Sequence, residues 1–223
     1  MPTILVTGAN RGIGRALAEA YAARGDRVIA TARRVDAAPA QPGLSYQPLD
    51  VTDPESCDRL ATSLSDLPVD VLVCNAGVLE GRGRVEDPAY TRDAWMTQLM
   101  TNVAGVFFTV RAVLPNLGRS GRGRIAIISS VMGSSERAPG GTYAYRASKA
   151  GAVNLARNLA ADLAKDGIAV GVYHPGWVQT DMGGARADIT VAESVAGLVG
   201  RIDALSLATT GVFEDYRGHP IPF

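Results

Sequence analysis

"TILVTGANRGIG" (residues 3–14) joins an apolar run directly to a glycine-rich turn and the start of an amphipathic segment. Residues 3–7 predict a buried strand, and residues 12–25 predict a helix that ends at Gly25. Gly8 allows a tight turn, Gly12 lets a phosphate approach the backbone, and Gly14 allows the helix to pack closely. An ordinary turn can have these glycines in the spacing G-x-x-x-G-x-G, but their place between strand and helix favours nucleotide binding.

The rest of the chain repeats this alternation of short apolar runs and longer periodic segments. Two helices carry start signals: Asp53 as N-cap with Pro54 at the first position, and Thr190 with Glu193 spaced as a capping box. One long helix is expected over 92–117 and another around YAYRASK (143–149). Further strands are predicted at 26–32, 44–49, 69–77, 123–130 and 167–176, with a last short strand in the tail 210–223.

Strands that are apolar on both faces and separated by helices predict a parallel sheet covered on both sides. Right-handed crossovers then give one doubly wound α/β sheet, a Rossmann fold with helices on both faces. No linker, repeat or low-complexity stretch divides the chain, so residues 1–223 are expected to form a single domain.

Composition narrows the class of protein. Lys and Arg total 22 and Asp and Glu total 22, a balance that argues against nucleic acid as a partner. EGRGRVED (80–87) and GRSGRGR (118–124) are short and read as surface loops rather than RNA-binding segments. Cys57 and Cys74 match no metal or disulfide framework. The N-terminus lacks a signal-peptide pattern and no apolar run is long enough to cross a bilayer, so no membrane partner and a cytoplasmic location are expected.

The end of the second strand bears on the choice of nucleotide. An NAD site usually has an acidic residue there to hold the ribose 2′-hydroxyl, whereas this chain has Arg33 and Arg34, with Arg11 in the glycine turn. Guanidinium groups would bind a 2′-phosphate, so NADP(H) is favoured over NAD(H). The alternative is that these arginines are solvated surface residues. Asp36 comes a few residues too late to replace the missing acid.

Tyr145 and Lys149 are four residues apart and therefore share one helix face, whereas Tyr143 has Ala147 at that spacing. A neighbouring ammonium is expected to lower the pKa of the Tyr145 phenol. Ser130 ends the fifth strand and NAG (75–77) ends the fourth, so all four signals are expected at the carboxyl edge of the sheet.

Six motifs in order resemble the short-chain dehydrogenase/reductase family: TGANRGIG, NAG, TNVAG, ISSVMG, YRASK and HPGWVQTDM. The match covers almost the whole chain. YAYRASKAG, HPGWVQTDMGG and the tail FEDYRGHPIPF resemble the compact carbonyl-reductase-like, or C-factor-like, branch.

The resemblance implies roles for particular residues. Tyr145 is similar to the family's general acid/base, and Lys149 to the residue that binds the nicotinamide ribose and lowers the tyrosine pKa. Ser130 resembles the residue that holds the substrate oxygen, and Asn102 the one that holds a water linking Lys149 to solvent. The implied cofactor-binding set is Gly8, Asn10, Arg11, Gly12, Ile13, Gly14, Arg33, Asp50, Val51, Asn75, Ala76, Gly77, Tyr145, Lys149, Pro175, Gly176, Val178 and Thr180. In this set Asp50 resembles the adenine contact, residues 75–77 the adenosine ribose side, and 175–180 the carboxamide segment. The implied set includes no metal.

The implied function is an NADP(H)-dependent oxidoreductase that interconverts a carbonyl compound and an alcohol by hydride transfer. A small-molecule carbonyl or alcohol is then the substrate, and partly apolar residues such as Val131 and Met132 favour aromatic or medium-chain compounds. The alternative is an NADP(H)-binding signalling or interaction protein with little catalysis. The segment after Thr180 is short, which suggests an open site. The family's usual tail is replaced, so either a homodimer or a homotetramer is possible.

Overall fold

The protein is described by a computed structural model that covers residues 1–35 and 41–223. Seven parallel strands form one sheet in the order β3-β2-β1-β4-β5-β6-β7, which confirms the doubly wound topology. The strands are β1 (Thr3–Val6), β2 (Arg27–Ala32), β3 (Leu44–Pro48), β4 (Val71–Cys74), β5 (Arg124–Ile128), β6 (Ala169–His174) and β7 (Phe213–Asp215). The helices are α1 (Gly12–Ala23), α2 (Pro54–Leu64), α3 (Arg92–Leu99), α4 (Gly105–Ser120), α5 (Tyr143–Leu163) and α6 (Val191–Ala204).

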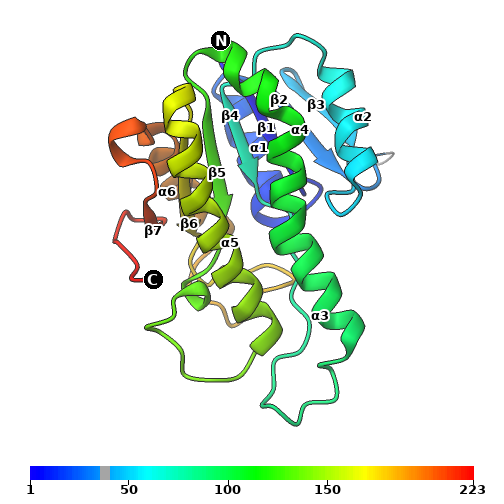
Figure 1. Cartoon of the computed structure of the whole chain (residues 1–223), viewed down its shortest axis with the longest axis vertical. Coiled ribbons are helices and arrows are strands. Elements are labelled where there is room, and N and C mark those ends of the chain that lie inside the picture. The colour runs from blue at the N-terminus through cyan, green and yellow to red at the C-terminus, as the bar shows by residue number, and fades with distance from the viewer. Residues whose placement is uncertain (36–40) are drawn as a thin grey trace.

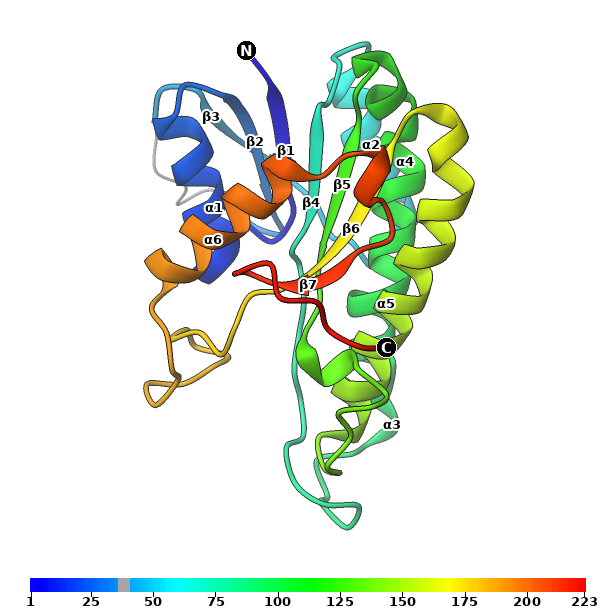
Figure 2. The ribbon, with the colours of Figure 1, turned by 90° about the vertical axis from the view of Figure 1, so that its left-hand side faces the viewer.

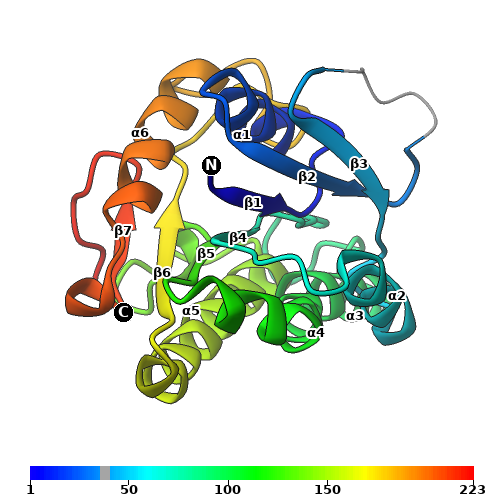
Figure 3. The same cartoon turned by 90° about the horizontal axis from the view of Figure 1, so that it is seen from above.

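The helices cover both faces of the sheet. Helices α1 and α6 lie side by side on one face, and α2, α4 and α5 lie on the other (Figures 2 and 3). Alternate residues of each strand point to opposite faces, so in β1 Ile4 and Val6 pack towards α1 and α6, while Leu5 packs towards α2, α4 and α5. Burial on both faces explains why the central strands β1 and β4 are buried throughout.

The predicted helix starts are borne out in part. The Asp53 carboxylate accepts a hydrogen bond from the Glu55 N–H, and Pro54 occupies the first helical position. Thr190 caps α6 by accepting from the Glu193 N–H. The predicted capping box is only half formed, because the Glu193 carboxylate accepts hydrogen bonds from Tyr216 and Arg217 instead.

The helix predicted over 92–117 is interrupted. Between α3 and α4 lies η1 (Met100–Ala104), a π-helical turn in which Gly105 N–H donates to the Met100 carbonyl. Hydrophobic periodicity cannot reveal such a turn, because both flanking helices continue the same apolar face. π-Helical turns occur often at functional sites, and this one contains Asn102.

Two long loops leave the carboxyl edge of the sheet, one after β4 and one after β5, and lie below the sheet in Figure 1. They contact each other near the start of α5, where Thr142 N–H donates to the Gly83 carbonyl over 3.2 Å and Tyr90 Oη accepts from Tyr143 N–H over 3.3 Å. The parallel topology thus places both loops at the edge where the polar signals of the sequence meet.

The predicted last strand is present as β7, at the edge of the sheet next to β6. The tail folds back along it: Ile221 N–H donates to the Phe213 carbonyl over 2.8 Å, and Asp215 N–H donates to the His219 carbonyl over 2.9 Å. These bonds use the outer edge of β7 within the chain, so pairing this edge with a second copy would require the tail to move.

Candidate active site

The order of the strands reverses between β1 and β4, which opens the crevice where ligands bind in doubly wound sheets. Residues that directly follow these two strands form hydrogen bonds with each other there. Thr7 Oγ1 accepts hydrogen bonds from the N–H groups of Asn75 and Ala76 over 3.0 and 3.1 Å. Asn75 Nδ2 donates to the Thr7 and Gly8 carbonyls over 3.0 and 3.1 Å. The glycine turn is therefore clamped from beneath, and the Asn75 side chain faces the turn rather than a ligand.

The turn leaves no room for side chains at two of its glycines. Gly8 has a φ of +62°, and a Cβ on it would lie 2.8 Å from Ala76 Cα. A Cβ on Gly14 would overlap Asn75 Nδ2 and lie 2.5 Å from the Gly8 carbonyl oxygen. The predicted reason for Gly14, close packing, is confirmed.

The start of α1 fits a bound phosphate. Arg11 is its N-cap residue but makes no side-chain capping bond, and no acidic residue lies in the first turn. The first N–H groups of a helix carry partial positive charge and attract anions. A Cβ on Gly12 would lie 3.6 Å from Thr180 Cγ2, so the turn also meets the predicted carboxamide segment. Asn10 is exposed and Ile13 is half-buried at this place.

Arg11 has a partner within the chain. Its Nη1 lies 2.9 Å from Asp181 Oδ2, and both side chains are largely exposed. The pair bridges the glycine turn and the segment that follows Thr180. A 2′-phosphate would therefore have to compete with Asp181 for this guanidinium.

Arg33 and Arg34 are exposed directly after β2 and make no ion pair among residues 1–35 and 41–223. Burial tends to raise the pKa of Asp50, but two hydrogen bonds from Thr52 and the charge of Arg33 lower it overall. Arg33 thus lies near the predicted adenine contact. Val51 packs in the core, close to Gly105. Asp36 lies outside the described residues.

Ser130, Tyr145 and Lys149 come together at the ends of β5 and the start of α5. Ser130 Oγ accepts from Met132 N–H over 3.1 Å, which leaves its O–H free to donate. Lys149 Nζ donates to the Ile128 carbonyl over 2.9 Å and lies 5.6 Å from the centroid of the Tyr145 ring. All three side chains are buried, whereas Tyr143 is 39% exposed and packs edge-on against Tyr90.

The expected lowering of the tyrosine pKa is wrong for the folded chain by itself. Burial raises the pKa of the Tyr145 phenol to about 12, and hydrogen bonding with Ser130 and the charge of Arg82 offset this only in part. Burial also lowers the pKa of the Lys149 ammonium to about 8. The lysine is thus a weakened source of positive charge, and Tyr145 is a neutral phenol at neutral pH.

Asn102 holds the loop segment that follows β4. Its Oδ1 accepts from Val78 N–H, and its Nδ2 donates to the Val78 carbonyl and to Ser148 Oγ, each over 2.9 Å. One turn earlier Gln98, absent from the sequence prediction, binds the N–H and carbonyl of Glu80 in the same way. The sequence does contain a signal for Gln98: it precedes Asn102 by four residues, a spacing that places both amides on one helix face.

Gly77 lies where Asn102 and Lys149 approach each other. A Cβ on Gly77 would be 3.3 Å from Asn102 Oδ1 and 3.6 Å from Lys149 Nζ. The predicted water-holding role of Asn102 stays a prediction. Its amide is already engaged with Val78 and Ser148, so a water would have to use a remaining lone pair or the main chain.

The segment 175–180 lies beside the glycine turn and is held by α6 and by its own loop. Ser194 Oγ donates to the Pro175 carbonyl over 2.6 Å, and Thr180 Oγ1 accepts from Gly183 N–H over 3.0 Å. Gly176 has a φ of +86°, and a Cβ there would lie 2.5 Å from Ile189 Cδ1. Val178 is buried and bridges to Ile189. The segment is thus fixed by packing before any ligand binds.

Two further residues complete the surroundings. Arg82, missed by the sequence prediction, donates to the Met182 carbonyl and so links the loop after β4 to the segment after Thr180. His174 precedes Pro175, and burial lowers the pKa of its imidazole to about 4, so the ring is neutral. Among the described residues no group of His, Cys, Asp and Glu could hold a metal ion. The described helices also include none with the length and apolar character of a membrane span.

The fold and this edge define a Rossmann-type α/β protein in which a serine, a tyrosine and a lysine share the carboxyl edge of the sheet with a glycine turn. The chain belongs to the short chain dehydrogenase family, whose sequence model matches residues 2–205. This membership makes it one of a family of oxidoreductases.

Individual relatives agree with that assignment. The chain is 41% identical over 166 residues to the C-signal of Myxococcus xanthus, covering 73% of this chain and 98% of that protein. Its structure is similar to the NADPH-bound carbonyl reductase from chicken fatty liver, with a TM-score of 0.91, 32% identity, and coverage of 100% and 99% of the two chains. It is also similar to the carbonyl reductase Sniffer of D. melanogaster, with a TM-score of 0.93, 28% identity, and full coverage of both chains.

Proposed function

We propose that the protein is an NADPH-dependent reductase of ketones or aldehydes, with Tyr145 as the proton donor. The observation that carries this proposal is the meeting of Ser130, Tyr145 and Lys149 at the carboxyl edge of the sheet. The similarity to the NADPH-bound chicken carbonyl reductase supports the choice of reaction.

Residues of the glycine turn and the start of α1 would hold the pyrophosphate, and Arg33 with Arg11 would bind the 2′-phosphate. Lys149 would hold the nicotinamide ribose. NADPH, when bound, supplies the hydride that is transferred to the carbonyl carbon. The reason to favour NADPH over NADH is Arg33, which is exposed and forms no ion pair within residues 1–35 and 41–223.

The substrate oxygen would lie between two hydroxyl groups. The O–H of Ser130, which hydrogen-bonds with Tyr145 in the folded chain, would donate to this oxygen and stabilise the negative charge that develops on it. Tyr145 would give its proton to the same oxygen, and burial keeps the phenol protonated at neutral pH, the form that a proton donor requires. Lys149, held by the Ile128 carbonyl, supports the phenolate that remains.

The test is Tyr145→Phe assayed with NADPH on a panel of ketones and aldehydes. Removing the proton donor is expected to lower kcat by roughly 10²–10⁴-fold, the usual contribution of general acid catalysis. NADPH binding, followed by the change in nicotinamide fluorescence, is expected to persist. An unchanged kcat would refute the role of Tyr145.

The similarity to C-signal supports a second candidate function, that of an NADP(H)-binding signalling protein with little catalysis. The same experiment separates the two. Tight NADPH binding by the unmodified protein without turnover of any carbonyl compound would favour the signalling role.

A further inference from the structure

An open pocket of about 460 Å³ lies between the loop after β5 and the first turn of α5. This volume suits a small-molecule pocket. Val131, which lines it, directly follows Ser130, and Arg146, which also lines it, directly follows Tyr145. A substrate whose carbonyl group is held by Ser130 and Tyr145 would extend naturally into this space. We call it the arginine pocket.

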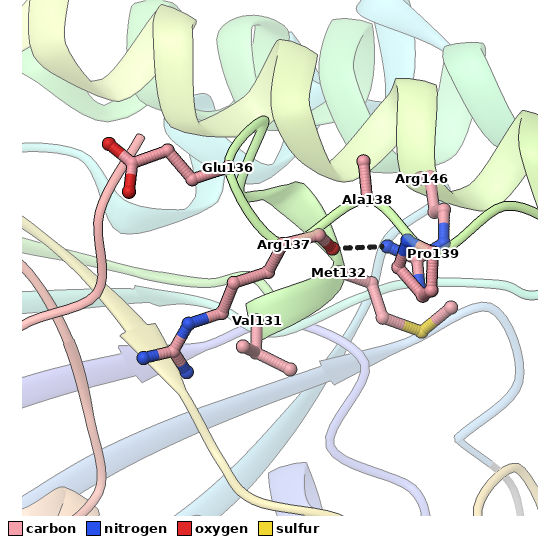
Figure 4. A pocket seen from close by; sticks show the side chains of 7 residues that line it. All are labelled: Val131, Met132, Glu136, Arg137, Ala138, Pro139 and Arg146. Carbon is pink, nitrogen blue, oxygen red and sulfur yellow. Dashed lines mark hydrogen bonds between the residues drawn. The ribbon is translucent and has the colours of Figure 1, made fainter.

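Arg146 brings a half-buried guanidinium to the pocket. Its Nη1 donates to the Arg137 carbonyl over 3.0 Å, as Figure 4 shows. Its Nε is buried and finds no acceptor among residues 1–35 and 41–223. A guanidinium stays charged at any physiological pH, so this unsatisfied donor is costly unless a ligand supplies an acceptor.

Arg137 lines the same pocket, and its side chain is exposed. Neither Arg137 nor Arg146 forms an ion pair with any carboxylate in the described part of the chain. The one acidic lining residue is Glu136, whose carboxylate lies apart from both guanidinium groups (Figure 4). The pocket therefore offers two guanidinium groups that form no ion pair with a carboxylate of the described residues.

The remaining lining is apolar: Val131, Met132, Ala138 and Pro139. These side chains would cover the hydrocarbon body of a ligand, and the flexible Met132 thioether can adapt to its shape. An apolar wall next to Ser130 with guanidinium groups beside it suits an amphipathic molecule. Such a molecule would have its carbonyl at Ser130 and Tyr145 and an anionic group at the arginines.

The local positive charge is wider than the pocket. Arg82 is near enough to Tyr145 to act on its pKa and also has no ion-pair partner among the described residues. Lys149 adds a further cation beneath Tyr145.

We propose that the arginine pocket binds an oxyanion group of the substrate, a carboxylate or a phosphate, through Arg137 and Arg146. The protein then prefers keto or aldehyde compounds that carry such a group over their neutral analogues. This specificity rests on the proposed carbonyl reductase function and names the substrate class for the same site.

The test compares matched substrate pairs with NADPH as reductant: 4-acetylbenzoate with its methyl ester, levulinate with its methyl ester, and 4-acetylphenyl phosphate with 4-hydroxyacetophenone. Hydrogen bonds to a charged group predict that at least one anionic member has a kcat/KM about 10-fold or more above its neutral partner. The carboxylate and phosphate pairs distinguish the two kinds of oxyanion.

The variants are Arg137→Gln, Arg146→Gln and the double substitution, which remove charge but keep polar side chains. The anion-to-neutral ratio is expected to fall towards one, mainly through KM of the anionic substrate. Arg27→Gln is the matched control, because Arg27 is an exposed residue at the start of β2, the opposite edge of the sheet. It should keep the original ratio. Glu136→Gln should raise the ratio by removing the one acidic lining residue.

A ratio of one for every pair, or a preference that survives the double substitution, would overturn the proposal while leaving the reductase function intact. Absence of turnover with all substrates would instead count against the reductase function. In that case the binding of 4-acetylbenzoate to the pocket is measured by calorimetry. Saturable binding that is lost in the double variant supports the anion site. Absence of binding overturns the proposal.

Discussion

The glycine turn and the arginine pocket lie at the same edge of the sheet, but they differ in whether their polar groups already have partners within the chain. Beneath the glycine turn, Thr7 and Asn75 satisfy main-chain groups from two strands. In the arginine pocket, Arg146 keeps a buried donor without an acceptor, and Arg137 has no anionic partner in the described chain. The first region is shaped before a ligand arrives, whereas the second offers charge for a ligand to neutralise.

This difference indicates how each region would select its ligand. The turn would bind phosphate through its backbone shape and the helix N-terminus, and it has no room for a side chain at Gly8 or Gly14. The arginine pocket selects by charge and can accept ligands of varied shape. Changes in the turn should impair folding and cofactor binding together, while changes in the pocket should alter substrate preference.

Arg33 provides the most direct test of this comparison, because it is an exposed cation within the proposed cofactor region. Arg33→Ala is expected to weaken NADPH binding by roughly 10-fold or more, the value of hydrogen bonds to a charged group, and to leave NADH binding nearly unchanged. Titration of both nucleotides measures this. Equal affinities for NADPH and NADH in the unmodified protein would mean that Arg33 is a solvated surface charge.

The burial of Lys149 has a consequence for stability. Burial holds its pKa at about 8, below that of an exposed lysine, so the unfolded chain binds more protons between about pH 8 and pH 10. The contribution of Lys149 to the free energy of unfolding should therefore rise with pH across this window. The rise is at most about 3 kcal/mol, from about 1.4 kcal/mol per pKa unit.

Lys149→Met isolates that contribution. At pH 7 the variant should be more stable than the parent, because it no longer buries a charge, although it loses the bond to the Ile128 carbonyl. The advantage should disappear near pH 10, as urea unfolding at both pH values would show. A constant difference across this range would mean that the lysine is not desolvated in solution.

Gly14→Ala tests how tightly the glycine turn is packed. The added methyl group overlaps Asn75 Nδ2 and should lower the free energy of unfolding by about 1–3 kcal/mol, as overpacking does, together with NADPH affinity. Gly200→Ala in α6 is the matched control, because its Cβ meets nothing within 4 Å. It should stabilise the protein by about 0.5–1 kcal/mol through helix propensity. Similar stabilities for the two variants would show that the turn is not tightly clamped.

The smallest effect is expected from Asp181→Ala, which frees Arg11. An exposed ion pair contributes little, so the melting temperature should shift by less than about 3 °C. NADPH affinity should rise by roughly 2- to 5-fold at low salt, because Asp181 no longer competes for the guanidinium. Weaker binding would instead mean that the bridge holds the segment after Thr180 in a useful position.

The sequence by itself determined the doubly wound sheet, the glycine turn and the meeting of Ser130, Tyr145 and Lys149. These follow from local patterns: buried parallel strands are apolar throughout, and residues at strand ends necessarily share the carboxyl edge of the sheet. The same reasoning placed Tyr145 and not Tyr143 in the site, through the i, i+4 spacing to Lys149.

Only the tertiary structure decided the state of these groups. The π-helical turn at Met100–Ala104, the amide clamps of Gln98 and Asn102, and the pairing of Arg11 with Asp181 depend on contacts between segments far apart in the chain. The raised pKa of Tyr145 depends on burial, which no spacing rule measures. Spacing shows which residues can meet, but desolvation and competing partners, both set by the folded chain, decide their charge and which of their donors stay free.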